Sequence, residues 1–431
     1  MDPAARPVVG LLGATGITGR TALAHLVARA PLEGAGVVVG ARDPGRVRDL
    51  CAERGLPVPE VLPVDVTDER SLDAFVRRVD VVVNLAGPYT RLAPPVLAAC
   101  VARGAHYVDL TGEAPLVLRT DRDLHAPARA AGVAIVHTAG FEALPADVLV
   151  DAARRAAAAR GETLRGADLV TTVRTPPGTG FRDAVSGGTV QSLLEVLRDP
   201  DRWRTGDVAA RLPDPAPGSG TAADPDAVRR TSPLRLPPRV AGGQVLAPMS
   251  PLAAINPPVV HRTQALSPVP GAPARPVAFR EAMAVGRWAG LGGPARLAAA
   301  TGASGFQALA GLVTRLPRPV RSGLADALSR ILPAAGTGPQ GDVLTGWSWT
   351  TRGTFTTHEG STFGAVLEAR GNPGYGTTAW LVVELALRMA VRGVPDAALG
   401  SSTPALALDG DLAALVPARV RITVDGRPAD R

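Results

Sequence analysis

The stretch VVGLLGATGITG, residues 8–19, decides the fold of this chain. An apolar run over 8–13 predicts a buried strand, and Gly13, Gly16 and Gly19 follow at GxxGxxG spacing. A helix is expected to open at the last glycine and to run over 19–30. This strand–turn–helix order is typical of the first unit of a dinucleotide-binding domain, in which the second glycine admits the pyrophosphate.

The same turn would present backbone N–H groups and the positive end of a helix dipole to a phosphate. A tight turn that binds nothing is the alternative. We expect it to hold a nicotinamide cofactor through seven consecutive residues: Gly13, Ala14, Thr15, Gly16, Ile17, Thr18 and Gly19.

Apolar strands alternate with helices up to about residue 145. Strands are predicted over 36–40, 63–66, 80–85, 106–110 and 133–137, with helices over 46–54, 71–78, 94–103 and 125–131. Continuous apolar strands alternating with helices indicate a parallel sheet covered on both faces. Right-handed crossovers then give a Rossmann-type doubly wound α/β fold.

Beyond this region the pattern changes. A helix over 145–160, a strand over 168–174, a hairpin over 347–357 and 362–369 and a helix over 374–394 are predicted. We expect residues 1–145 and about 371–431 to form the dinucleotide-binding domain. Residues 146–370 would form a second α/β (α+β) domain, inserted before a C-terminal return helix. Residues 199–245, rich in Pro and Gly and without periodicity, are predicted to be a lid or a disordered excursion.

The tip of the second strand indicates which nicotinamide cofactor is bound. Arg42 comes first there, and an arginine binds the 2′-phosphate of NADP, whereas an acid holds the ribose hydroxyls of NAD. Asp43 is the competing residue, but it also suits a helix N-cap. This order favours NADP(H), with Asp65 and Val66 flanking the adenine.

Polar residues that follow the later strands are the candidates for chemistry. Tyr89 comes directly after the fourth strand and is expected to protonate the anion that hydride addition leaves. Asp109 lies at the end of the fifth strand and Glu113 follows it, and both are expected to orient substrate or relay a proton. A turn cap is the alternative for Asp109, and a solvated side chain is the alternative for Glu113. The nicotinamide is expected beside the small-residue turn Ala86, Gly87 and Pro88.

Three further residues are expected to contact substrate. His137 ends the sixth strand, Glu142 follows shortly after it, and Tyr375 opens the return helix. A satisfied core histidine is the alternative for His137, and a hinge or packing role is the alternative for Tyr375.

The composition excludes several classes of protein. The 46 basic residues are all arginine, so a Schiff-base lysine, a P-loop and a Ser-Tyr-Lys triad are ruled out. Arginines are interleaved with the 39 acidic residues, which favours compositional bias over a nucleic-acid surface. Cys51 and Cys100 lie far apart in the sequence, and no Cys or His residues have metal-binding spacing, so neither a disulfide nor a metal site is expected. The polar stretch before the first strand is too short for a signal peptide. We therefore expect a protein of the reducing cytoplasm.

Residues 297–314 carry no charge, and the length of this uncharged segment is close to the minimum for a membrane span. Three glycines and several polar residues argue against a span. A buried helix or the apolar wall of a substrate pocket is predicted instead, with a membrane-surface role as the alternative.

Seven motifs recur in an order that resembles one known family. They are GATGITG (13–19), GPY (87–89), AHYVDLTGE (105–113), HTAGFEALPAD (137–147), SGGT (186–189), AAIN (253–256) and GNPGYGTTA (371–379). Together they resemble the saccharopine-dehydrogenase-like oxidoreductases, especially the bacterial branch called trans-acting enoyl reductases. The resemblance spans nearly the whole chain apart from about 199–245.

The resemblance implies an NADP-binding Rossmann domain joined to a second α/β domain. It also implies NADPH-dependent reduction of a C=C bond in a small, lipid-like or polyketide-like substrate, or of a C=N bond. A non-catalytic, NADP-binding regulatory protein is the alternative from another class. The family pattern has Asp-Ser-Ile where this chain has Glu142, Ala143 and Leu144, which bears on substrate identity. The expected partner is a small molecule, free or carrier-bound, and not nucleic acid; peripheral membrane contact and a homodimer are left open.

Overall fold

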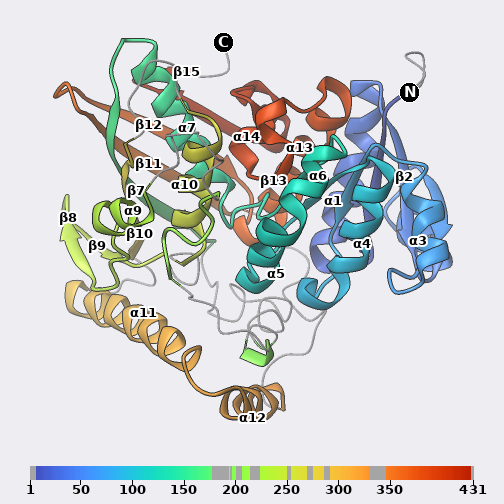
Figure 1. Ribbon diagram of the computed structural model, residues 1–431, viewed down its shortest axis with the longest axis horizontal. Coiled ribbons are helices and arrows are strands. Elements are labelled where there is room, and N and C mark those ends of the chain that lie inside the picture. Colours follow the sequence, from blue (N-terminus) through green and yellow to red (C-terminus); the bar gives the residue numbers. More distant parts are fainter. Residues whose placement is uncertain are drawn as a thin grey trace.

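The computed structural model describes residues 6–176, 194, 197–199, 206–213, 224–249, 254–268, 275–285, 292–330 and 346–428. Two β-sheets organise these residues, one on each side of the view in Figure 1. The first is a Rossmann-type parallel sheet and the second is a mixed sheet. The predicted fold class is therefore confirmed.

The first sheet has seven parallel strands in the order β13-β6-β5-β4-β1-β2-β3. The chain reverses its direction of progress across the sheet at β1, so β1 and β4 border the crevice where this topology binds dinucleotides. The strands are β1 (Val8–Leu12), β2 (Gly36–Ala41), β3 (Glu60–Pro63), β4 (Val81–Asn84), β5 (His106–Asp109), β6 (Ala134–Val136) and β13 (Gly400–Ser402).

Both faces of this sheet are buried. Val81 and Val83 pack into the core on one face, and Val82 between them packs into a separate core on the other. This two-sided burial explains why the strands are continuously apolar. The helices of this part are α1 (Ile17–Arg29), α2 (Pro44–Glu53), α3 (Glu69–Val76), α4 (Tyr89–Arg103), α5 (Ala114–Arg119) and α6 (His125–Ala130), with a π-helical turn over Thr120–Leu124.

The second sheet has eight strands in the order β15-β14-β12-β11-β7-β10-β9-β8. They are β7 (Leu164–Arg174), β8 (Arg239–Ala241), β9 (Gln244–Ala247), β10 (Ala278–Val285), β11 (Ser348–Thr357), β12 (Thr362–Arg370), β14 (Val420–Val424) and β15 (Arg427–Pro428). Trp349 and Phe355 alternate with more exposed neighbours along β11, so one face is buried. The accompanying helices are α7 (Leu144–Ala158), α9 (Pro225–Thr231), α10 (Asn256–Leu266), α11 (Gly293–Val313) and α12 (Arg318–Ser329).

The chain returns to the first sheet near its end. Helix α13 (Thr378–Arg392) packs beside α1, where Glu384 accepts hydrogen bonds from His25 (2.7 Å) and Arg29 (2.9 Å) (Figure 1). Strand β13 extends the first sheet beyond β6, and the short helix α14 (Pro404–Leu408) follows. Residues 371–431 were expected to belong entirely to the first domain, but β14 pairs with β12 in the second sheet. This pairing covers an edge of the second sheet that would otherwise be open.

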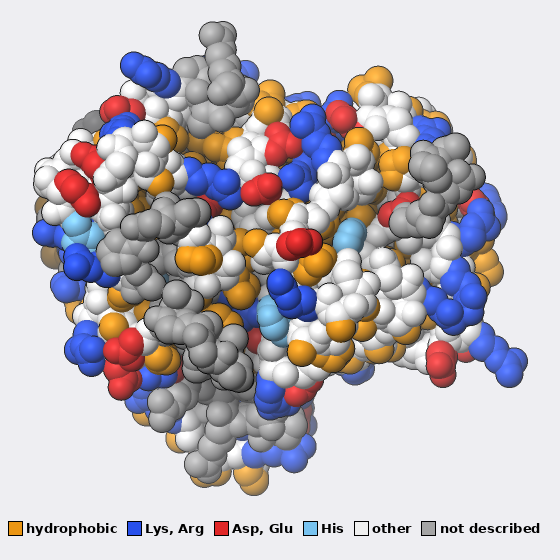
Figure 2. Space-filling view, turned by 45° about the horizontal axis from the view of Figure 1, so that its top comes forward, with side chains coloured by type: hydrophobic (Ala, Val, Ile, Leu, Met, Phe, Trp, Pro, Cys, Tyr) orange, Lys and Arg blue, Asp and Glu red, His pale blue; other side chains and the backbone are white. Residues whose placement is uncertain are grey.

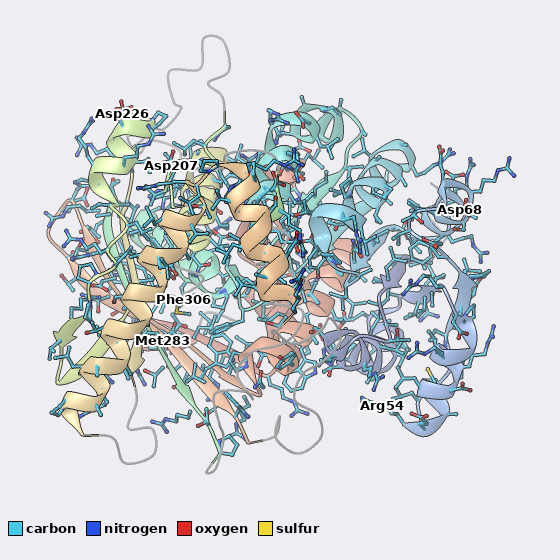
Figure 3. The ribbon with its side chains drawn as sticks, turned by 90° about the horizontal axis from the view of Figure 1, so that it is seen from below. Arg54, Asp68, Asp207, Asp226, Met283 and Phe306 are labelled. Carbon is cyan, nitrogen blue, oxygen red and sulfur yellow. The ribbon has the colours of Figure 1, made fainter. Side chains whose placement is uncertain are left out.

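The described parts of the segment 199–245 contain secondary structure that its composition did not predict. Its described residues form α9 and the β8–β9 hairpin, which extends the second sheet. Arg229 pairs with both Asp207 and Asp226, two residues labelled in Figure 3. A disordered excursion is therefore wrong for these parts, whereas a lid stays a prediction.

Three smaller predictions also need correction. Strand β3 lies over 60–63 instead of 63–66, and α4 begins at Tyr89, five residues before the predicted start. Helix α11 is not buried, since Phe306, Leu309 and Leu312 are each more than half exposed. Within the described parts of the chain, no helix combines the length and apolarity needed to cross a bilayer.

Candidate functional site

The glycine-rich turn after β1 has room for no side chain at two of its three glycines. Gly13 has φ +81°, and a Cβ there would lie 2.5 Å from the carbonyl carbon of Leu85. A Cβ at Gly19 would overlap the carbonyl oxygen of Gly13. Both positions therefore require glycine, one for the turn and one for the close packing of α1 on β1. Gly16, in contrast, is exposed at the start of α1.

The start of α1 fits a bound pyrophosphate. No side chain caps the helix, and its first turn contains no acidic residue. Its first N–H groups and the positive end of its dipole are thus available to an anion that approaches over Gly16. Ala14 is buried under the turn, whereas Thr15, Ile17 and Thr18 are half-buried along the cradle.

The tip of β2 separates the roles of its two charged residues. Asp43 Oδ1 accepts hydrogen bonds from the N–H groups of Gly45 (2.9 Å) and Arg46 (3.3 Å), so Asp43 is the N-cap of α2. Arg42 is exposed and has no hydrogen-bond or ion-pair partner among the described residues. Asp65 accepts from the N–H and hydroxyl of Thr67, and these bonds, with a smaller contribution from Arg42, lower its pKa. The predicted alternative for Asp43, a helix cap, is what the geometry shows.

A buried polar chain joins the carboxyl ends of β4, β5 and β6. Asn84 Nδ2 donates to the hydroxyl of Tyr107 (3.0 Å), which donates to Asp109 Oδ2 (2.8 Å). His137 Nδ1 lies 2.9 Å from the same oxygen, and its Nε2 lies 3.0 Å from the hydroxyl of Thr120. All five side chains are buried, so Asp109 and His137 hold the strand ends in register.

Glu113 positions the first turn of α4. Its Oε1 accepts from the Tyr89 N–H (3.1 Å), and its Oε2 accepts from the N–H (2.6 Å) and the hydroxyl of Thr90. The side chain is buried, so it is not the solvated residue that was one of its predicted alternatives. By capping α4 from another loop, Glu113 fixes where Tyr89 lies.

The pKa values of Glu142 and Tyr89 are both raised at this edge. Burial, with a smaller contribution from the charge of Asp109, raises the pKa of Glu142 to about 7, and its buried Oε2 has no hydrogen-bond partner in the described structure. A Cβ at Gly140 would overlap this oxygen, so the turn closes tightly over the carboxyl group. Burial and the charges of Asp109, Glu142 and Glu113 raise the pKa of Tyr89 well above 10.

The turn that carries Glu142 also touches the second sheet and the return helix. The Phe141 ring meets Trp349 edge to face, with 4.9 Å between the centroids, and the Phe141 N–H donates to Thr378 (3.0 Å). Tyr375 is buried in the π-helical turn Pro373–Thr377, which contacts α1 and is capped by Asn372. The structure thus brings Tyr89, Asp109, Glu113, His137 and Glu142 to one edge, whereas Tyr375 lies in a turn that contacts α1.

Sequence reasoning missed a second buried polar pair. Asn256 Nδ2 donates to Glu281 Oε2 (2.8 Å), while Asn256 Oδ1 and Glu281 Oε1 are buried without partners in the described residues. Burial raises the pKa of Glu281 to about 8. Ile255 is so close that a Cβ at Gly112 would lie 3.0 Å from it, so α10 begins beside the loop of Glu113. Asn256 ends the AAIN motif, which was the available signal; residues 186–189 of SGGT lie outside the described residues.

Residues 9–136 match the family described as saccharopine dehydrogenase NADP binding domain. A Mycobacterium tuberculosis protein, provisionally named a trans-acting enoyl reductase, is 33% identical over 422 residues, covering 95% of this chain and 94% of the relative. The chain belongs to the saccharopine-dehydrogenase-like oxidoreductases. A trans-acting enoyl reductase of Mycobacterium bovis is 31% identical and covers 97% of both chains.

The fold of this saccharopine-dehydrogenase-like oxidoreductase is also similar to that of a yeast enzyme. The apo saccharopine dehydrogenase (L-Glu forming) of Saccharomyces cerevisiae aligns over 97% of this chain and 99% of its own, with a TM-score of 0.50 and 15% identity. This likeness concerns the two-sheet fold alone. The family match covers the glycine loop and Arg42, and it confirms NADP(H) as the cofactor.

Proposed function

We propose that this oxidoreductase uses NADPH to reduce the polarised C=C bond of an enoyl or enone substrate. The observation that carries the proposal is Glu142, which lies beside Tyr89 at the carboxyl edge of the first sheet and has a pKa of about 7 and a buried Oε2 without a hydrogen-bond partner among the described residues. An acid whose pKa lies near the working pH suits proton donation. The name of the bacterial relatives supports the same reaction class.

The cofactor supplies a hydride when bound, and the protein orients the substrate and provides a proton. The glycine loop would hold the pyrophosphate, Arg42 the 2′-phosphate, and the turn Ala86–Pro88 would border the nicotinamide. The raised pKa of Tyr89 keeps its phenol protonated, so its hydroxyl can donate a hydrogen bond to the substrate carbonyl oxygen as negative charge develops there. Glu142 in its acid form then protonates the α-carbon and becomes a carboxylate, which solvent reprotonates. Asp109, His137 and Glu113 act as positioning residues.

The reaction is tested by loss of NADPH absorbance with a panel of 2-enoyl thioesters, enones and cyclic imines. Deuterium from labelled NADPH should appear at the β-carbon of a saturated product, as read by mass spectrometry. Turnover of imines alone would make this chain a C=N reductase. NADPH binding without turnover of any member of the panel would favour a regulatory protein.

Replacing Tyr89 with phenylalanine is expected to lower kcat by roughly 10²-fold, because the ring remains but the hydrogen bond to the developing oxyanion is lost. Binding of NADPH, measured by fluorescence titration, should be almost unchanged. A variant with normal turnover would remove Tyr89 from the chemistry, and a variant that loses NADPH affinity would place it in the cofactor pocket.

Arg42→Ala is expected to abolish the preference for NADPH over NADH, which we expect to be at least about tenfold, or roughly 1.4 kcal/mol, in the natural chain. The arginine is exposed and has no hydrogen-bond or ion-pair partner in the described parts of the chain, and its loss would remove a bidentate partner for the 2′-phosphate. Titration of both cofactors checks this. Arg54→Ala at the far end of α2 (Figure 3) is the control and should keep the preference. Equal affinities in the natural chain would contradict the assignment.

A further inference from the structure

A groove with a volume of about 470 Å³ lies on the outer face of the second sheet. Its charged lining residues are Arg174, Arg352, Arg370, Arg419, Arg421 and Glu368. None of them falls within residues 9–136, which match the NADP-binding family. The groove is therefore distinct from the cofactor cradle at the start of α1.

The register of four neighbouring strands gathers these arginines. Ser348 of β11 lies opposite Arg174 of β7 on one side and Arg370 of β12 on the other. Glu368 pairs in register with Arg421 of β14. These positions alternate with the buried Trp349 and Ala369, so their side chains share the outer face of the sheet.

Among the residues that the structure describes, the arginines of this groove outnumber the acidic residues that line it. Glu368 lies 3.9 Å from Arg352, whereas Arg174, Arg370 and Arg421 form no ion pair with a described residue. The whole chain has 46 basic and 39 acidic residues, and the two kinds lie interspersed on the face shown in Figure 2. Five arginines against one glutamate is a local excess that the composition does not explain. Arg421 lies opposite the single glutamate, whereas Arg174 and Arg370 both lie opposite the neutral Ser348, so a bound anion would supply the missing negative charge.

One end of the groove is organised by more than charge. The backbone of Arg419 is left-handed, with φ +60°, and its guanidinium lies 4.6 Å from the centre of the Trp380 ring. The Arg370 N–H lies 3.3 Å from the Arg419 carbonyl oxygen. Ser348 and Thr350 add hydroxyl groups to the lining. The groove thus lies over strands whose register is fixed by backbone pairing, and the arginine side chains line it.

We propose that this groove is a second anion site that binds a phosphate-bearing ligand. Guanidinium groups bind phosphate oxygens in bidentate fashion, and several of them around one cavity suit two linked phosphates. The volume is that of a small-molecule pocket. The phosphates belong either to a free anion such as pyrophosphate or to an ester such as a nucleoside diphosphate. The site does not depend on the reductase reaction.

Calorimetric titration with pyrophosphate, and separately with ADP, tests the proposal while NADPH saturates the cofactor site. We expect one equivalent of either probe to bind, and we expect the Arg370→Gln/Arg421→Gln variant to weaken binding at least tenfold. Arg165→Gln, an exposed arginine at the other end of β7, should leave binding unchanged. Tighter binding of ADP than of pyrophosphate would identify an ester ligand, and equal or weaker binding a free anion.

NADPH affinity should be the same in all three proteins, which separates this site from the cofactor cradle. Circular dichroism verifies the fold, and Arg421→Gln alone replaces the double variant if that variant does not fold. Absence of binding under saturating NADPH, or binding that the variants leave unchanged, would overturn the proposal.

Discussion

Glu142→Gln is expected to lower kcat by about 10²- to 10⁴-fold while leaving NADPH affinity unchanged. The amide keeps the shape of the side chain but has no acidic proton to give to the α-carbon. In the natural protein the acid form of Glu142 predominates below its pKa of about 7, so kcat should fall as the pH rises through about 7. The variant should lose this descending limb of the kcat profile.

Asp147→Asn is the matched control for this prediction. Burial also raises the pKa of Asp147 to about 7, but its oxygens accept hydrogen bonds from Thr263 and from the Ala405 N–H (2.8 Å). It lies on α7 and contacts α10 and α14, and we assign it no part in the chemistry. The control should therefore retain the descending limb. Persistence of that limb in Glu142→Gln would assign the proton to another group.

Asp121→Ala is expected to lower the free energy of unfolding by about 3–5 kcal/mol, the cost of leaving buried charge without its partner. Asp121 accepts two hydrogen bonds from Arg211 (2.8 and 3.0 Å) and one from Ser401 (2.6 Å). Arg262, which is 1% exposed, lies 3.5 Å from the same carboxylate. Burial alone would raise the pKa of Asp121, but the charges of the two arginines outweigh it and lower that pKa.

This cluster joins the two sheets. Asp121 and Ser401 belong to the first sheet and its π-helical turn, whereas Arg262 belongs to α10, which packs on α7. Arg262 also donates to the carbonyl oxygens of Ser401 (2.8 Å) and Arg211 (2.6 Å). Removing the carboxylate leaves two buried guanidinium groups without their counter-charge, so the contact between the two parts of the molecule should weaken.

Urea denaturation followed by circular dichroism measures the loss. Asp123→Ala, two residues away, is the control, because Asp123 is half exposed and pairs with the exposed Arg122. Exposed pairs contribute about 0–1 kcal/mol, so this variant should remain close to the natural protein. Similar losses in the two variants would show that burial of the Asp121 cluster does not determine its contribution to the free energy of unfolding.

The parallel sheet and its glycine loop could be predicted from the sequence because their signals are local. An apolar run such as 80–85 has two buried faces whatever surrounds it, and Gly13 and Gly19 meet atoms of their own strand–turn–helix unit or of the adjacent β4. The return helix and the hairpin of the second sheet were likewise visible as periodic segments. Arg42 and Asp43 could be separated because a helix cap has a short-range signature.

The features that could not be predicted depend on partners that are distant in the chain. Helix α4 begins at Tyr89 because Glu113, 24 residues later, caps it, and the sequence around Pro94 contains no trace of that contact. Arg211 can be buried because it pairs with Asp121, although its own segment was predicted to be a lid or a disordered excursion. The perturbed pKa of Glu142 likewise arises from burial and from Asp109, which belongs to another strand.

The sequence by itself therefore determined the fold class, the cofactor cradle and the residue types available for chemistry, since these follow from periodicity and from turns closed by neighbouring residues. Only the tertiary structure decided which acid has a pKa raised by burial, which acids serve as caps, and where arginines gather without counter-charges among the described residues. Burial and electrostatic interactions depend on distances in space between residues far apart in the chain, and a linear pattern carries no measure of those distances.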